Sequence, residues 1–344
     1  MCPLIVSTVD YHTAGEPFRI VSGGVPTAVG ATVVERRAWA ADHLDDVRRL
    51  LVNEPRGHAD MYGGFVTPPD DDGAVLGVVF FHNEGYSTAC GHGTIALATW
   101  AIDSGLVAAP DDGPLVLHLD VPSGRVGAVA EVVDGRARSV RFRNVPTHVE
   151  ALDVPLDLGD RRVTVDLAYG GAFYATVEAD QVGCTVTPGD LPRLIDAGRR
   201  IKRATQATRL LAHPDGPHLD GLYGVIFHEV LGDGHQRNVT VFADGEVDRS
   251  PCGSGTSARL AVLAERGAMR PGDVLTHDSI VGSRFIGRLL GRQEASGNQE
   301  GSGNQEASGR VGWLTEVEGR ASRTGYHTFV RDPDDEVGTG FLLR

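Results

Sequence analysis

Two short turns, each containing one cysteine, carry the chemistry that this sequence predicts. The first turn, residues 89–94, reads ACGHGT, and the second, residues 251–256, reads PCGSGT. Each follows an apolar run typical of a strand and leads into a stretch typical of a helix. Two thiols on opposite sides of one carbon atom can remove a proton from one face and return a proton to the other. The repeated turn therefore predicts a two-base reaction on a small molecule.

The Cys-Gly-x-Gly pattern of both turns suits a reactive thiol at the start of a helix. Glycine lets the backbone turn tightly and approach a ligand closely. The helix points its unpaired N–H groups and the positive end of its dipole back at the turn. That environment lowers the pKa of a cysteine, which favours the thiolate, and it also binds an anion such as a carboxylate. We predict that Cys90 and Cys252 are catalytic; the alternative is that both are small buried residues behind tight turns.

The elements that must position these turns predict two similar α/β halves. Strands are predicted over residues 5–11, 78–81, 115–119, 125–132 and 239–242, and helices over residues 36–51, 94–104, 191–207 and 256–266. The helix over 191–207 stands in the second half where the helix over 36–51 stands in the first, and Pro192 is tolerated in its opening turn. Because corresponding elements occur in the same order, we interpret the chain as a duplication.

The boundaries of the two halves follow from this order. We place the first half, with Cys90, at residues 1–140, and we expect the end of the chain, residues 325–344, to return to it. The second half, with Cys252, spans residues 141–324. Within it, residues 293–309 repeat a six-residue unit, QEASGN, with almost no apolar content. Such a composition does not build a core, so a flexible surface loop between two strands is expected.

Composition narrows the class of protein. The chain has 344 residues and a formal net charge of −14, which argues against nucleic acid or an anionic membrane as a partner. It has no apolar stretch of about 18 residues and no basic-then-apolar N-terminus, so we predict a cytoplasmic protein. A metal site is not expected, because no His/Cys spacing suits zinc. Cys2 and Cys184 are predicted to be structural, acting as small apolar side chains.

Other features near the turns have two interpretations each. His92 either contacts a substrate carboxylate or tunes Cys90, or it is an ordinary turn residue. Asp248 either caps the chain before the second helix or accepts a hydrogen bond from a substrate amine. Both turns also match the loose dinucleotide pattern GxGxxA, which leaves nucleotide binding as a remote alternative. The histidines predicted to be structural are His12, His58 and His82.

The two turns and several flanking motifs resemble the signature sequences of the proline racemase family. That family includes proline racemase, 4-hydroxyproline 2-epimerase and trans-3-hydroxy-L-proline dehydratase. The second turn lies in the similar motif DRSPCG, residues 248–253. The other similar motifs are HTAGEP at 12–17, NEPRG at 53–57, Gly170-Gly171 and GSRFIG at 282–287. The resemblance covers nearly the whole chain apart from residues 293–309.

The resemblance implies both a fold and a kind of active site. The fold is diaminopimelate-epimerase-like, of class α/β (α+β), with two pseudo-symmetric domains, each a mixed sheet wrapped around a central helix, and an active site in the cleft. The chemistry needs no cofactor, and Cys90 and Cys252 are the implied base and acid. The residues implied to hold the substrate's carboxylate and amine are Gly91, His92, Asp248, Gly253 and Ser254.

The branch of the family depends mainly on the second cysteine. The dehydratases typically have threonine there, because eliminating water needs one base rather than a base and an opposed acid. Cys252 therefore favours a racemase or epimerase acting on proline or a hydroxyproline. The motifs DMYG at 60–63, HNEGY at 82–86 and AYGGAFY at 168–174 resemble the dehydratase branch instead.

We therefore keep trans-3-hydroxy-L-proline dehydratase as the alternative function. The hydroxyproline epimerases also have a histidine near the position of Asp220, for which His218 is the nearest candidate. The expected partners are the small-molecule substrate, proline or a hydroxyproline, and a second copy of the chain in a homodimer.

Overall fold

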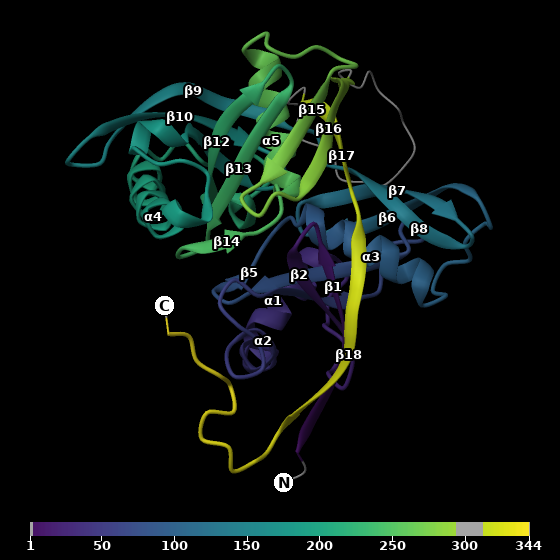
Figure 1. Ribbon diagram of the computed structural model, residues 1–344. Helices are drawn as coiled ribbons and strands as arrows, with labels where there is room; N and C mark the ends of the chain where they lie inside the picture. Colours follow the sequence, from purple (N-terminus) through teal and green to yellow (C-terminus); the bar gives the residue numbers. More distant parts are fainter. Residues whose placement is uncertain (1–2, 294–311, 344) are drawn as a thin grey trace. The chain divides into compact units, whose positions relative to one another are not determined.

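The protein chain divides into two compact units (Figure 1). A computed structural model describes residues 3–293 and 312–343. The first unit contains residues 1–142, 248–250 and 318–344, and the second contains residues 143–247 and 251–317. The short segment 248–250 thus belongs to the first unit, although the chain on both sides of it belongs to the second.

The strands of the first unit form a mixed sheet. In order across the sheet, with each strand paired to the next, they are β18 (Ala321–Arg331), β1 (Leu4–Thr13), β2 (Glu16–Gly23), β3 (Tyr62–Thr67), β4 (Leu76–His82), β6 (Gly113–Val121) and β7 (Gly124–Val133). The β2–β3 and β4–β6 pairs are parallel and the other pairs are antiparallel. Parallel pairs need a crossover connection, and the β4–β6 crossover contains the Cys90 turn.

The second unit repeats this topology. In order across the sheet its strands are β9 (His148–Asp157), β10 (Arg162–Tyr169), β11 (Phe173–Glu178), β12 (Leu222–Gly232), β13 (His235–Phe242), β15 (Val274–Ser279) and β16 (Arg284–Arg292). Counted across each sheet, the third and fifth strand pairs are parallel in both units; in the second unit these are β11–β12 and β13–β15. The pseudo-symmetry predicted from the duplicated turns is therefore confirmed. The remaining strands are β5 (Gly85–Tyr86), β8 (Arg136–Arg143), β14 (Glu246–Asp248) and β17 (Trp313–Gly319).

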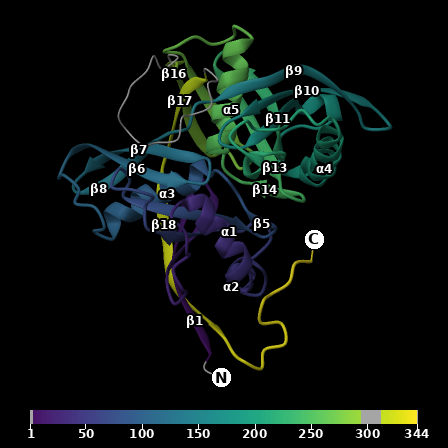
Figure 2. The same cartoon turned by 180° about the vertical axis from the view of Figure 1, so that it is seen from behind.

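A buried helix begins directly after each cysteine. In the first unit α3 (Gly91–Asp103) packs against β1, β2, β7 and β18. In the second unit α5 (Gly253–Glu265) packs against β9, β10, β11 and β16, as Figure 2 shows. Both helices have 13 residues and are buried along nearly their whole length, which is typical of a helix enclosed by its own sheet.

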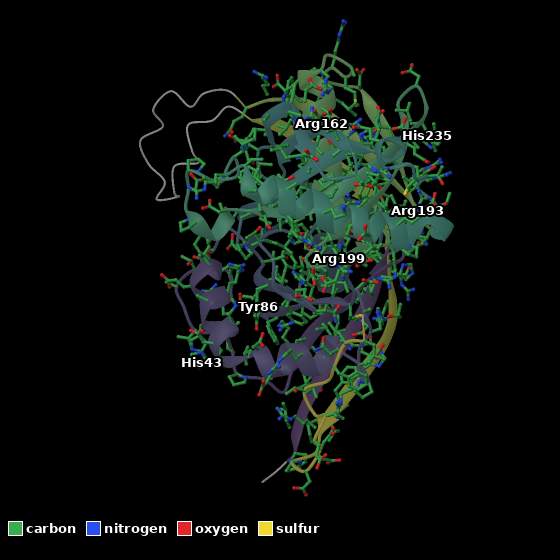
Figure 3. All side chains as sticks on the ribbon, turned by 90° about the vertical axis from the view of Figure 1, so that its left-hand side faces the viewer. His43, Tyr86, Arg162, Arg193, Arg199 and His235 are labelled. Atoms are coloured by element: carbon green, nitrogen blue, oxygen red, sulfur yellow. The ribbon has the colours of Figure 1, made fainter. Side chains whose placement is uncertain are left out.

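The outer helices differ from the sequence prediction in one place. The sequence predicts a single helix over residues 36–51, whereas the structure has α1 (Val33–His43) and α2 (Asp45–Val52). The break occurs at Leu44, whose φ of −118° lies outside the helical range and whose side chain is buried. In the second unit α4 (Leu191–Ala207) matches the prediction, and Figure 3 looks onto its outer side, where Arg193 and Arg199 are labelled.

Two sequence-based expectations concern other parts of the chain. The repeat at 293–309, predicted to be a surface loop, lies outside the described residues except for Gln293. Across residues 3–293 and 312–343, the helices are all too short or too polar to cross a lipid bilayer.

Candidate active site

The first cysteine turn places a thiol at the N-terminus of a buried helix. Cys90 is the N-cap of α3, and its Sγ accepts the N–H of Gly93 at 3.2 Å. The N–H and the hydroxyl of Thr94 both donate to the Cys90 carbonyl oxygen, at 3.0 and 2.8 Å. The helix starts at Gly91, three residues before the predicted start, because the cysteine itself serves as the cap. The donated N–H and the helix dipole both favour the thiolate form of Cys90.

His92 lies beside this thiol as a neutral ring. Its Nδ1 is 3.5 Å from the Cys90 Sγ, and its carbonyl oxygen accepts the Thr13 hydroxyl at 2.9 Å. Burial lowers the pKa of His92 to about 3. Its Nδ1 is 4.0 Å from the Asp248 carboxylate, but with the ring neutral this contact is not an ion pair. His92 therefore offers the thiol a hydrogen-bonding partner rather than a positive charge.

The segment 248–250 brings Asp248 into the first unit. The Asp248 carboxylate is buried and accepts the N–H and the hydroxyl of Ser250, at 2.8 and 2.7 Å. Asp248 thus caps the turn that precedes the second cysteine, whereas the N-cap of α5 is Cys252. The interpretation of Asp248 as a cap of this turn is therefore confirmed.

Arg249 is bound by two carboxyl groups of the first unit. Its backbone N–H donates to the Glu16 Oε2 at 2.7 Å. Its guanidinium lies 3.7 Å from the same oxygen and 3.2 Å from the Asp60 carboxylate. These contacts hold the segment 248–250 in place, and Asp248 with it. The contact between Arg249 and Glu16 was not predicted from the sequence. The two residues are 233 positions apart, and local sequence patterns carry no sign of such a contact.

Glu16 is an unusual carboxyl group because it is fully buried in the sheet. Its Oε1 has no hydrogen-bond partner among the residues that the structure describes. Burial, and next the nearby charge of Asp248, raise the pKa of Glu16 well above its usual value. The site therefore favours the protonated, uncharged form of this side chain.

We expect Glu16→Gln to become more stable relative to the wild type as pH rises. The folded state keeps a proton on Glu16 that the unfolded chain loses above about pH 4.5, so wild-type stability falls as pH rises from there through the folded-state pKa. Glutamine is uncharged and has no such loss. Urea unfolding of both proteins between pH 4 and pH 8 measures the difference.

Substitution of the exposed Glu84 by glutamine is the matched control for this measurement. The difference in the free energy of unfolding between Glu84→Gln and the wild type should not increase with pH. If the difference in the free energy of unfolding between Glu16→Gln and the wild type stayed constant across this pH range, Glu16 would be ionised in the folded state.

The second cysteine turn has a different local geometry. Cys252 has φ 61° and ψ 105°, in the positive-φ region that favours glycine. Its Sγ is directed at Tyr174 and donates to the Tyr174 Oη at 3.8 Å. The same Oη lies 2.7 Å from the Ser254 Oγ, and all three side chains are buried. Tyr174, which lies on β11, was not among the residues predicted from the sequence.

The Gly170-Gly171 pair has a steric role in this turn. A Cβ on Gly170 would lie 2.5 Å from the Ser254 carbonyl oxygen, which is closer than any side chain tolerates. The Asn144 amide donates to the Gly170 carbonyl oxygen at 2.8 Å and fixes the pair. The first turn of α5 can therefore approach the β10–β11 connection only because this position lacks a side chain.

Each unit thus holds part of the predicted site. The first unit contains Cys90, Gly91, His92 and Asp248, and the second contains Cys252, Gly253 and Ser254. The predicted candidate His218 lies in η3 (Pro217–Leu219), whereas the ring of the nearby buried His213 packs against Tyr169 and Phe173.

The other cysteines and histidines considered in the sequence lie away from the two turns or outside the described residues. Cys184 lies in the apolar core beside α4, as expected, and Cys2 is outside the described residues. His12 and His82 each accept a backbone N–H two or three residues further along the chain, and the ring of His58 contacts the carbonyl oxygen of Ala59. Within the described part of the chain, no group of three or more His, Cys, Asp or Glu side chains could hold a metal ion.

Comparison with known proteins gives consistent matches over the whole chain. The profile of the proline racemase family matches residues 8–342. A trans-3-hydroxy-L-proline dehydratase of Bacillus thuringiensis subsp. konkukian is 43% identical over 341 residues, 98% of each chain. A 3-hydroxyproline 2-epimerase of Burkholderia multivorans is also 43% identical, again over 98% of each chain.

Solved structures give the same result. A hydroxyproline epimerase from Agrobacterium vitis, with bound trans-4-OH-L-proline, superposes with a TM-score of 0.88 and 33% identity. The match covers 99% of this chain and 96% of that one. The predicted fold class is therefore confirmed.

Proposed function

This chain is an enzyme that belongs to the proline racemase family, and on that premise we propose that it is a cofactor-independent racemase or epimerase. It inverts the α-carbon of proline or a hydroxyproline with two opposed thiols. One observation carries the proposal: Cys90 and Cys252 are the N-caps of equivalent helices in two units of the same topology. A reaction that runs in both directions through opposite faces of one carbon needs this kind of paired base and acid.

Each group at the two turns has a role in this reaction. The thiolate of one cysteine removes the α-proton, and the thiol of the other donates a proton to the opposite face. Negative charge then develops on the substrate carboxylate. The first N–H groups of α3 and α5, at Gly91, His92, Gly253 and Ser254, stabilise that charge, because they have no partner within their own helices. The Asp248 carboxylate accepts a hydrogen bond from the substrate amine.

The path of the chain supports a joint role for both turns. Asp248 and Ser250 belong to the first unit, and Asp248 lies 4.0 Å from His92. Cys252 follows Ser250 by two residues, and two residues of extended chain span at most about 7 Å. The second cysteine therefore follows, four positions later along the chain, the carboxylate that we assign to the substrate amine.

The names of two relatives support a substrate class. The dehydratase and the 2-epimerase described above act, by their names, on 3-hydroxyproline, so we propose a proline-ring amino acid and place 3-hydroxyproline first among those to test. The dehydratase remains the second candidate because one of these relatives carries that name. Against it stands Cys252, since elimination of water needs one base and not an opposed acid.

We expect the purified protein, with no added cofactor or metal, to exchange the α-proton of its substrate for deuterium in D2O. Proline, trans-4-hydroxy-L-proline and trans-3-hydroxy-L-proline are each incubated with the enzyme, and NMR measures the loss of the α-proton signal. Chiral chromatography then identifies the epimer, and mass spectrometry detects loss of water. If trans-3-hydroxy-L-proline loses water and none of the three forms an epimer, the protein is a dehydratase and the racemase proposal is wrong.

A further inference from the structure

Tyr174 makes the environment of the second thiol different from that of the first. In the first unit the rings beside His92 are Phe18 and Tyr62, and the Tyr62 hydroxyl bonds to Ser87. In the second unit the Tyr174 hydroxyl contacts both the Cys252 Sγ and the Ser254 Oγ. The tyrosine is fully buried, so water does not compete for these contacts.

The backbone at Cys252 supports a directed contact. A residue other than glycine is strained at φ 61° and ψ 105°, and this conformation persists only where the surroundings impose it. In the first turn the sulfur accepts the N–H of Gly93, with ordinary extended dihedral angles at Cys90. The unusual conformation at Cys252 instead turns its sulfur toward Tyr174.

We propose that Tyr174 is a positioning residue that lets Cys252 act as both acid and base. This inference rests on the proposed two-thiol reaction. With Cys252 as the thiol, its S–H donates to the Tyr174 Oη, and the Tyr174 O–H donates to the Ser254 Oγ. With Cys252 as the thiolate, the Tyr174 O–H rotates to the sulfur, and the Ser254 O–H donates to the Tyr174 Oη.

The protons balance in this step without ionisation of Tyr174 or Ser254. The S–H bond of Cys252 breaks, its electron pair stays on sulfur, and the proton forms the new C–H bond of the substrate. The two hydroxyl groups only rotate, and the reverse reaction restores their first arrangement. A hydrogen bond to a charged sulfur is stronger than one between neutral groups, so the tyrosine stabilises the thiolate more than the thiol.

Two substitutions test this with opposite expected signs. In the enzyme without substrate, iodoacetamide alkylation of each cysteine is measured by mass spectrometry from pH 5 to pH 10. For Tyr174→Phe we expect the pH midpoint for Cys252 to rise by about one unit, because the thiolate loses a charge-assisted bond. For Ser254→Ala we expect the Cys252 midpoint to fall, because the thiol state loses the bond that the Tyr174 O–H donates to Ser254, whereas the thiolate state keeps the charge-assisted bond from that O–H to the sulfur. The Cys90 midpoint is the internal reference and should not move.

Turnover gives an independent readout. We expect Tyr174→Phe to lower kcat about tenfold with a change in KM of less than about threefold, because substrate binding groups are untouched. Tyr11→Phe is the matched control: it removes a buried tyrosine hydroxyl that donates to Asp103 at the far end of α3, and it should leave both parameters unchanged.

The outcomes separate this inference from the proposed function. Unchanged Cys252 midpoints in both variants, or shifts of the same sign, would overturn the role of Tyr174. If Tyr174→Phe does not fold, the Ser254→Ala midpoint still decides, because a midpoint that does not fall contradicts the rotating hydroxyl. Absence of proton exchange in the wild type would instead refute the two-thiol reaction, while the alkylation midpoints would still report on the Tyr174 contact.

Discussion

Cys90→Ser and Cys252→Ser are each expected to lower the rate of α-proton exchange on the order of 10²–10⁴-fold. A serine hydroxyl is a far weaker base at neutral pH than a thiolate at a helix N-terminus. The folded structure should survive, because the change is nearly isosteric and serine is itself a good N-cap, able to accept the Gly93 N–H that now bonds to the Cys90 sulfur. NMR in D2O measures exchange, and circular dichroism checks the fold.

Cys184→Ala is the matched control for the two serine variants. Cys184 lies in the apolar core of the second unit, so its loss should lower stability slightly and leave turnover unchanged. If one of the two turn cysteines proves dispensable, the reaction uses a single base, as the dehydratase alternative requires. Full activity in both serine variants would remove the thiols from the mechanism altogether.

Gly93→Ala is expected to lower turnover on the order of 100-fold, as a displacement of about 1 Å at a reacting atom can do. A Cβ at position 93 would lie 2.7 Å from the Cys90 Sγ and 2.5 Å from the Phe18 ring. Since real Cβ atoms do not approach this closely, the sulfur or the ring must shift. A shifted sulfur loses the Gly93 N–H and its place at the helix terminus.

The chain offers a glycine that controls for this substitution. Gly23, at the end of β2, has an ordinary φ, and a Cβ at this position would have no heavy atom within 4 Å, so Gly23→Ala should leave kcat and KM unchanged. Equal activity of Gly93→Ala and the wild type would mean that the Cys90 sulfur does not need its present position. A crystal structure of the variant would then show where the sulfur lies.

Local patterns predicted the elements that carry the site. Helix α4 was predicted from residue 191 to residue 207, because it stands in the second half where the first helix stands in the first half and Pro192 suits its opening turn. The start of α3 was predicted three residues late, since two glycines in the first turn lower helix propensity while the Cys90 cap fixes the start. The single helix predicted over 36–51 is broken at the buried Leu44, whose non-helical backbone angles no local pattern announces.

The contacts that complete the site could not be predicted in this way. Glu16 meets Arg249 across 233 positions, and Tyr174 meets Cys252 across 78. A single sequence carries no periodic or compositional sign of such pairs, because they arise from sheet topology rather than from neighbouring residues. The motifs HTAGEP and AYGGAFY marked the right segments, but only the structure shows which of their side chains touch the cysteine turns or the segment beside them.

The pairing of β1 with β18 has a consequence for the order of folding during synthesis on the ribosome. Leu4 pairs with Arg331, so β1 must wait for the synthesis of β18 before its sheet is complete. The second unit, by contrast, has all its residues once position 317 has emerged. Domains generally fold from the N-terminus onward as they are made. Of the two units, the first is therefore begun earlier and completed later. Because it consists of three separate segments of the chain, no single truncation of the chain would give the complete first unit.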